Sequence, residues 1–296
     1  MEHLLKEARA RAPFLVTWCA VLALVVVLYI LVADLTQWDA IKAILQSIAT
    51  TLVASLFIAL MILLYLPSGS EVQELSLVEA QDISRLLRSA AQTSRSWLFS
   101  GGSGRFLRAT TLPALLKTAR DEHVSITLRA VLYDPENDQL CDRYATYRRD
   151  SASELGENAW TTEKVRLEIL ATLFELYRAR QMTDALDLQI ALTETMSVLR
   201  YDISDRYAVA TTEGKEAPAV RADVGTHYYE TYRRVVHDQI GQGREIKIVK
   251  DGSANTAATA EAVSSALTSM GFGLHLSDAL LAQIASTAHA KVNPYR

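Results

Sequence analysis

A glycine-rich run near residue 100 has the residue types that bind an anion. Residues 96–100, SWLFS, form a short apolar stretch typical of a strand, and the run follows this stretch directly. Glycine lets backbone N–H groups approach a ligand closely, and a helix that begins after such a loop points its positive end at the same place. Two arginines follow, and we expect them to pair with the anion. The predicted anion-binding residues are Gly101, Gly102, Ser103, Gly104, Arg105 and Arg108.

The pattern of this run matches neither the P-loop nor the dinucleotide-binding sequence G-x-G-x-x-G, so it does not specify the ligand. A tight turn that merely requires glycine is the alternative interpretation. His227, beside Tyr228 and Tyr229, is a further candidate for ligand binding, and a partly buried structural histidine is its alternative. No spacing typical of a metal site or a nucleophile elbow occurs, so no metal, no cofactor and no catalytic residue is predicted.

A hairpin is predicted from two apolar stretches, 198–203 and 207–212, that are joined by a tight turn. The order of strand, glycine-rich turn, helix, strand and later hairpin resembles one half of a phospholipase D-like domain, over roughly residues 95–245. The motif of that superfamily is H-x-K-x-x-x-x-D, and with Asp205 at its aspartate, Arg200 stands at the lysine and Val198 at the histidine. The resemblance therefore implies a degenerate site in which Arg200 and Asp205 hold phosphate without catalysis. An unrelated α/β sandwich is the alternative.

A hexamer recurs as YATYRR at 144–149 and YETYRR at 229–234, on two predicted helices. In each copy a tyrosine and an arginine share one helix face, which is a suitable surface for a nucleotide. Coincidence together with ordinary solvated arginines is the alternative interpretation, since the sequences around the hexamers are not alike.

Strands that alternate with helices predict an α/β fold, with a mixed sheet and flanking helices, that corresponds to a single phospholipase D-like half. The expected strands are 96–100, 124–133, 186–193, 198–203, 207–212 and 245–249. The expected helices are 71–93, 112–122, 136–149, 161–182 and 226–240, followed by two alanine-rich segments. This domain is predicted to cover residues 96–296.

The N-terminal part has two long runs without charge, at 14–33 and 43–66. Each is long enough to cross a bilayer, so a two-helix membrane anchor is predicted over 1–66, followed by a juxtamembrane stalk helix over 67–95. The second run carries small residues at every fourth position, which suits close packing against the first helix. A contact between copies, which gives the expected homo-oligomer through these helices, and a hydrated face in an oligomeric pore are the alternatives. Lysine and arginine are concentrated before the first run, which predicts that both termini are cytoplasmic. The similarity of this layout to bacterial membrane effectors implies the bacterial inner membrane as the location. A cleaved signal peptide and a buried hairpin are the alternatives.

The whole chain has a net charge of −4, so no basic field favours duplex nucleic acid as a partner. The expected partners are the lipid bilayer, further copies of the chain and a nucleotide or another phosphate-bearing ligand. This organisation resembles that of two-transmembrane bacterial effectors in signalling or anti-phage defence. The resemblance implies a membrane-anchored effector whose α/β domain senses a nucleotide-like ligand or a partner and whose helices oligomerise or perturb the membrane. A membrane-tethered phosphodiesterase or nucleotide-processing enzyme is the first alternative, and a non-enzymatic membrane scaffold is the second.

Overall fold

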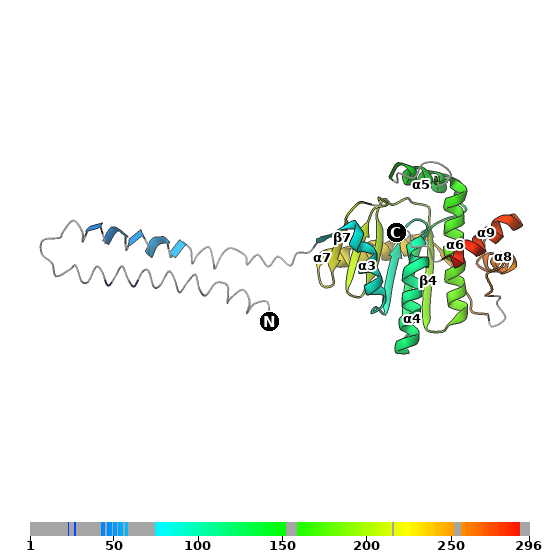
Figure 1. Cartoon of the computed structure of the whole chain (residues 1–296), viewed down its shortest axis with the longest axis horizontal. Coiled ribbons are helices and arrows are strands. Elements are labelled where there is room, and N and C mark those ends of the chain that lie inside the picture. The colour runs from blue at the N-terminus through cyan, green and yellow to red at the C-terminus, as the bar shows by residue number, and fades with distance from the viewer. Residues whose placement is uncertain are drawn as a thin grey trace. The chain divides into compact units, whose positions relative to one another are not determined.

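The computed structural model describes residues 75–151, 159–214, 216–251 and 256–290, together with single positions between 23 and 58. The chain divides into two compact units, Met1–Val72 and Gln73–Arg296. The second unit contains a mixed α/β fold, in which one sheet is flanked by helices (Figure 1). The predicted fold class is confirmed at this level.

The sheet of the second unit has eight strands in the order β1-β7-β6-β5-β2-β3-β4-β8. Strands β2, β3 and β4 are parallel, and the strands that continue from β2 on its other side, as well as β8 beyond β4, are antiparallel to their neighbours. Their bounds are β1 Ser76–Val78, β2 Ser96–Ser100, β3 Ile126–Tyr133, β4 Leu186–Thr193, β5 Arg200–Ser204, β6 Tyr207–Thr211, β7 Ala219–Asp223 and β8 Arg244–Ile246.

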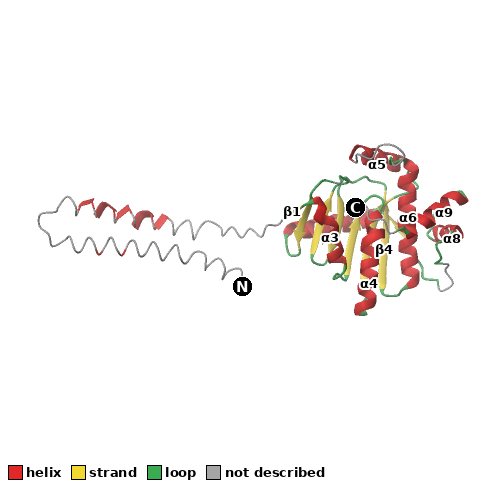
Figure 2. Ribbon diagram, viewed as in Figure 1, coloured by secondary structure: helices red, strands yellow, loops and turns green. Residues whose placement is uncertain are grey.

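The helices cover the sheet in two groups. The helices α3, α4 and α6 pack on one face around the larger core (Figure 2), whereas α7 covers the other face (Figure 1). The helix α5 lies across one end of the sheet (Figure 1). The bounds are α3 Ala80–Ala91, α4 Leu112–Glu122, α5 Asp138–Ser151, α6 Thr162–Met182, α7 His227–Gln242, α8 Ala260–Ser269 and α9 Asp278–His289, and a π-helical turn, η1, at Leu107–Thr111.

Side-chain oxygens fix the starts of four of these helices. The hydroxyls of Thr161, Thr226, Thr259 and Ser277 accept a hydrogen bond from a backbone N–H in the first turn of α6, α7, α8 and α9, respectively. Such a bond satisfies one of the N–H groups that a helix start leaves without a partner. The sequence therefore specifies these helix boundaries locally.

The prediction of a two-helix membrane anchor is corrected. The expected spans, 14–33 and 43–66, lie largely outside the described residues. In the part of the chain that the structure describes, no helix combines the length and the apolar character needed to cross a membrane. The lipid bilayer as partner, the homo-oligomer through membrane helices and the inner-membrane location with cytoplasmic termini are therefore withdrawn.

The described part of the segment expected as a stalk helix over 67–95, residues 75–95, belongs instead to the sheet unit. Its strand β1 pairs antiparallel with β7, and Ile83 and Leu87 of α3 are buried in the larger core. Neither β1 nor β7 was predicted from the sequence. Both are short, and β7 has the sequence AVRAD, in which polar residues interrupt the apolar pattern that identifies a strand.

Candidate functional site

The candidate site lies where the sheet changes from parallel to antiparallel pairing. Strand β2 pairs with β3 in parallel on one side and with β5 antiparallel on the other. The glycine loop follows the carboxyl end of β2, and Arg200, the first residue of β5, lies beside this loop. Strands β3 and β4 continue the sheet from β2 in one direction, whereas β5, β6 and β7 continue it in the other direction, so the order of the strands reverses at β2. In open α/β sheets, ligands bind outside the carboxyl ends of the strands at such a reversal.

The glycines of the loop are required by close packing. A Cβ atom at Gly101 would lie 2.7 Å from Cγ of Arg200, and one at Gly102 would lie 2.4 Å from Cζ of Tyr144. Gly104 has a φ of +68°, which side chains rarely adopt, and a Cβ there would lie 2.8 Å from Leu132. The loop is thus a tight turn in which glycine brings Arg200 and Tyr144 against the backbone.

Tyr144 of α5 is the donor at the centre of the site. Its buried hydroxyl donates to Oε1 of Glu213 over 2.5 Å, and Ser103 of the loop also hydrogen-bonds to it. Burial raises the pKa of Tyr144 to about 12, although the positive charges of Arg148 and Arg200 oppose this rise. The hydroxyl therefore stays protonated at neutral pH, and it lies within the electrostatic reach of two arginines.

Arg148 and Arg105 both contact the indole ring of Trp160, which lies beside Tyr144. The guanidinium of Arg148 pairs with Glu213 and lies 4.4 Å from the ring centroid of Trp160, while that of Arg105 lies 5.3 Å from the same ring. The rings of Trp160 and Tyr144 are 6.3 Å apart. Trp160 therefore positions two guanidinium groups through cation–π contacts.

Arg108 has a different role from Arg105. It is buried, and its Nη2 donates to Oε2 of Glu168 over 2.7 Å, while its Nη1 donates to the hydroxyl of Thr172 over 3.1 Å. These bonds join η1 to α6. Arg105 pairs with the other oxygen of Glu168 over 3.2 Å but remains 24% exposed. Arg108 was predicted to bind the anion, and the structure uses it to join two helices.

Arg200 is held in place by a buried carboxylate. Its Nε donates to Oδ2 of Asp202 over 2.7 Å, and its guanidinium lies 5.4 Å from the ring of Phe106. Burial raises the pKa of Asp202, and the charge of Arg200 opposes this rise. The pairing orients Arg200 toward the glycine loop, as a second residue commonly orients a binding group.

Asp205 and His227 are not part of this site. Asp205 lies in the turn after β5, at the other end of that strand from Arg200, which places the two roughly 16 Å apart along the strand. Its Oδ2 accepts from the backbone N–H of Arg95, just before β2. His227 begins α7 at that same opposite end, since Asp223 of β7 pairs with Tyr207. The structure therefore does not assemble the expected phosphate-holding pair.

We use the name arginine cluster for Arg105, Arg148 and Arg200 together with Tyr144 and Trp160. The sequence pointed to Tyr144 and Arg148 only through the first hexamer, and Trp160 and Glu213 were missed. The second hexamer serves a different purpose, since the hydroxyl of Tyr229 donates to the carbonyl of Ser204 and anchors α7 to the sheet. The two hexamers therefore do not form equivalent surfaces.

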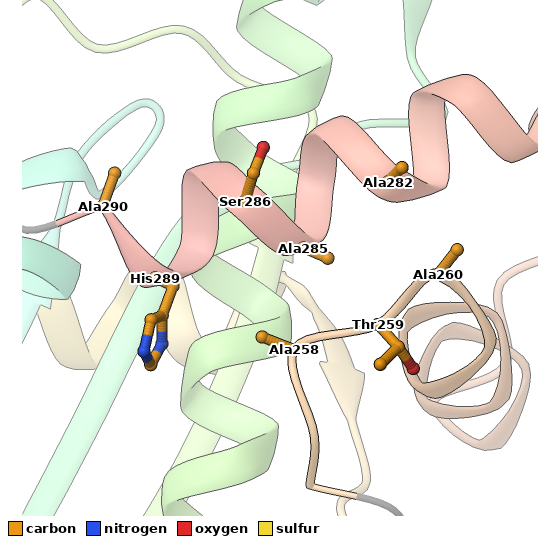
Figure 3. Close-up of a pocket in the computed structure, with 8 residues that line it drawn as sticks. All are labelled: Ala258, Thr259, Ala260, Ala282, Ala285, Ser286, His289 and Ala290. Carbon is orange, nitrogen blue, oxygen red and sulfur yellow. The ribbon is translucent and has the colours of Figure 1, made fainter.

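A hollow between α8 and α9 has a volume of about 570 Å³ (Figure 3). Small side chains line it, with His289 as its one ring: Ala258, Thr259, Ala260, Ala282, Ala285, Ser286, His289 and Ala290. These groups offer no set of converging charges, and the hollow does not compete with the arginine cluster as a candidate site.

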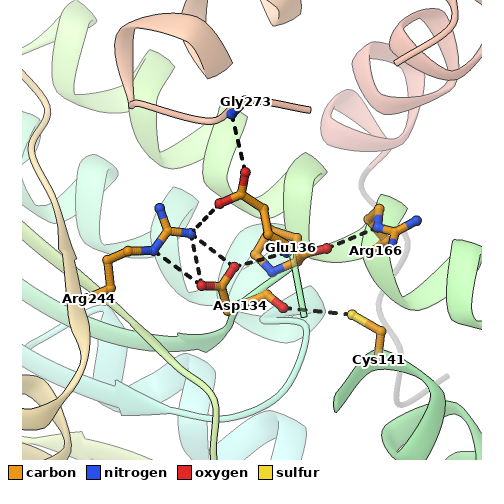
Figure 4. Close-up of polar contacts among 7 residues, drawn as sticks. Asp134, Glu136, Cys141, Arg166, Arg244 and Gly273 are labelled. Atoms are coloured by element: carbon orange, nitrogen blue, oxygen red, sulfur yellow. Dashed lines mark hydrogen bonds and ion pairs between the residues drawn. The ribbon is translucent and has the colours of Figure 1, made fainter. Parts of the chain in front are cut away.

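A second hollow, of about 670 Å³, lies at the carboxyl ends of β3 and β4 and has an acidic lining. Arg244 there donates to Asp134 over 2.9 Å and to Glu136 over 2.8 Å, and Glu136 accepts from the backbone N–H of Gly273 (Figure 4). This network ties the C-terminal segment to the sheet. Across the described residues, no group of histidine, cysteine or acidic side chains is arranged to hold a metal ion.

No family model matches this chain, and no curated protein sequence matches it. A solved structure of TrmBL2, an archaeal chromatin protein, is similar at 10% sequence identity with a TM-score of 0.34. The similarity covers 72% of this chain and 69% of that chain, and that structure is described as showing a novel mode of DNA binding. A likeness this low does not transfer DNA binding to the present chain.

Two predictions are corrected at this point. No phospholipase D family is found by the comparisons, and Arg200 and Asp205 lie at opposite ends of β5, so the resemblance to that superfamily and to a two-transmembrane effector is withdrawn. The expectation that duplex nucleic acid is not a partner rested on the net charge alone, and it is withdrawn as well.

Proposed function

We propose that the sheet unit is a sensor domain, which binds a small phosphate-bearing ligand such as a nucleotide at the arginine cluster and does not transform it. The observation that carries the proposal is the meeting of Tyr144 and Arg148 on one carboxylate, that of Glu213, beside the glycine loop. Two donors that already hold a carboxylate have the geometry to hold a phosphate oxygen.

The origin of the three arginines supports an anionic ligand. Arg105 follows the glycine loop, Arg148 belongs to α5 and Arg200 begins β5, so three separate elements direct guanidinium groups to one end of the sheet. Their side chains are 24%, 14% and 11% exposed, respectively. Arginine suits planar recognition of phosphate, and partial burial strengthens each charge-assisted bond.

The chemistry of the neighbouring side chains favours binding over turnover. None of the described residues that hydrogen-bond to or stack on Tyr144 and Arg148 is a histidine or a cysteine. Hydrolysis of a phosphodiester through a covalent intermediate needs such a nucleophile, or a base that activates one. The hydroxyl of Tyr144 does not supply a nucleophile, because burial raises its pKa to about 12.

Titration of the full-length chain with ATP and with inorganic pyrophosphate, followed by calorimetry, tests this function. We expect binding without turnover, and Arg148→Ala should weaken it by roughly 1.5–3 kcal/mol, about ten- to a hundredfold. Arg143→Ala is the matched control, since Arg143 is an exposed residue of the same helix and its loss should leave the affinity unchanged.

Phosphorus NMR of the same mixtures separates the alternatives. Hydrolysis of ATP or pyrophosphate that is lost in Arg148→Ala would identify an enzyme. Absence of binding by the wild-type chain to either compound, or equal weakening in Arg148→Ala and Arg143→Ala, would contradict the sensor.

A further inference from the structure

Glu213 lies in the connection between β6 and β7 and reaches the arginine cluster from there. Strand β6 ends at Thr211, and a short turn follows Glu213, in which the backbone N–H of Ala217 donates to the carbonyl of Gly214 over 3.2 Å. The side chain of Glu213 is only 16% exposed. The carboxylate of Glu213 is thus held inside the proposed site by its own contacts, because Glu213 lies outside the pairing of β6 with β7.

The carboxylate of Glu213 takes both donors of α5 that the proposed ligand needs. Its Oε1 accepts from the hydroxyl of Tyr144, and its Oε2 accepts from the guanidinium of Arg148. An ionised carboxylate is only an acceptor, as phosphate oxygens are, so the two present the same chemistry to these donors. Both anions cannot occupy the same place, because their charges repel and their oxygens overlap.

Two buried polar atoms in or next to the arginine cluster lack a hydrogen-bond partner among the described residues. Nε1 of Trp160 and Oγ1 of Thr211 have no hydrogen-bond partner among the described residues, and both residues are no more than 2% exposed. Trp160 stacks with Arg148, and Thr211 lies directly opposite Arg200 in the sheet register. Buried polar atoms without partners are uncommon, and these two belong to residues that neighbour Arg148 and Arg200, respectively.

We infer that Glu213 is an internal ligand that closes the arginine cluster, and that a phosphate-bearing ligand binds by displacing its carboxylate and releasing the β6–β7 connection. This inference rests on the proposed function and adds its regulation. Displacement gives the sensor its response, because the loop that carries Glu213 must move when Tyr144 and Arg148 change partner. The affinity for the ligand is then reduced by the fraction of molecules in which Glu213 occupies the site.

Replacement of the charge on Glu213 tests the inference in the full-length chain, with inorganic pyrophosphate as the probe. Glu213→Gln keeps the size of the side chain and weakens its bonds to Tyr144 and Arg148, so pyrophosphate should bind roughly tenfold more tightly or better. Glu216→Gln is the matched control, because Glu216 is an exposed acid of the same connection. The affinity of this variant for pyrophosphate should equal that of the wild type.

Amide exchange in the wild-type chain provides a second measurement that needs no variant. Pyrophosphate should accelerate the exchange of the Ala217 amide, whose bond to Gly214 belongs to the turn that carries Glu213. An affinity of Glu213→Gln that equals or falls below that of Glu216→Gln, or unchanged exchange at Ala217 under saturating pyrophosphate, would overturn the inference.

The two proposals fail in different ways. If the wild type binds pyrophosphate and Arg148→Ala does not, the sensor function holds even when Glu213→Gln fails to bind more tightly, and only the internal ligand is rejected. If neither the wild type nor Glu213→Gln binds pyrophosphate or ATP, the proposed function itself is rejected, and the internal ligand is rejected with it.

Discussion

A single methyl group at Gly102 would collide with the most constrained side chain of the site. The added Cβ would lie 2.4 Å from Cζ of Tyr144 and 2.7 Å from its hydroxyl oxygen. The ring of Tyr144 is buried among Tyr133, Tyr147 and Trp160, so it has no open space into which to move. The backbone at Gly102 and the position of the Tyr144 hydroxyl are therefore coupled.

We predict that Gly102→Ala lowers the free energy of unfolding by about 1–3 kcal/mol, the usual cost of an overpacked core, and also weakens pyrophosphate binding. Gly241→Ala is the control. A Cβ at Gly241, within α7, meets nothing within 4 Å, and alanine there should raise the free energy of unfolding by roughly 0.5–1 kcal/mol. Urea unfolding followed by circular dichroism measures both. Equal effects of the two substitutions would contradict the close packing at Gly102.

The sequence identified part of the site and missed its acidic member for a physical reason. The glycine loop and the neighbouring arginines are contiguous, so their types and spacing were readable. Glu213 stands 69 residues from Tyr144 in a polar loop, and its contact depends on the lengths of β5 and β6. Asp205 shows the opposite error, because a motif spacing of five residues, when laid along an extended strand, separates Arg200 and Asp205 by the whole length of β5.

At the scale of the elements, two tyrosines hold α5 against the sheet. The ring of Tyr144 in α5 packs edge-to-face on that of Tyr133 in β3, with the centroids 5.0 Å apart. The hydroxyl of Tyr133 donates to the carbonyl of Ser197 over 2.7 Å and accepts from its N–H over 3.0 Å. Burial raises the pKa of each tyrosine to about 12.

These pKa values predict a loss of stability in alkali. An exposed tyrosine of the unfolded chain ionises near pH 10, whereas the folded chain keeps both protons until about pH 12. The contribution is therefore complete below about pH 10 and is lost as the pH rises toward 12, at roughly 2–3 kcal/mol for each tyrosine. Urea unfolding at a series of pH values measures this fall.

Tyr144→Phe should reduce the loss of unfolding free energy in alkali by the contribution of one tyrosine, roughly 2–3 kcal/mol. Tyr228→Phe, at an exposed position of α7, should leave the profile unchanged. Identical alkaline profiles for the wild type and Tyr144→Phe would show that the hydroxyl of Tyr144 is not buried in the folded chain.

The long parallel strands could be recognised from the sequence, whereas the two short strands at one side of the sheet, β1 and β7, could not. Strands β3 and β4 are long runs dominated by apolar residues, and both were predicted because strands covered on both faces have this composition. Strands β1 and β7 are three and five residues long and mix polar with apolar side chains. These two strands are defined by their pairing with a neighbouring strand, and the local pattern of residues holds no information about that pairing.

At the scale of the sheet unit, α6 connects the sheet to the C-terminal helices. Twelve of its 21 residues are buried, which is more than one face of a helix, and α9 and α8 pack along it. A helix that is buried on most sides needs cover on most sides. The residues that supply this cover from α9 include Leu281, Ile284 and Ala285, which belong to the same core as the sheet.

This continuity predicts that α9 unfolds together with the sheet rather than as an appendage. Ile284 is fully buried, and Ile284→Ala should lower the free energy of unfolding of the single main transition by about 2–4 kcal/mol through loss of contacts and the cavity left behind. Gln283→Ala, at the adjacent exposed position, should change it by less than about 0.5 kcal/mol. Calorimetry of the full-length chain distinguishes the two arrangements. An independent C-terminal pair of helices would give a separate early transition that alone responds to Ile284→Ala, whereas a shared core moves the main transition, because the side chains of α9 and the buried face of α6 lose their contacts at the same time.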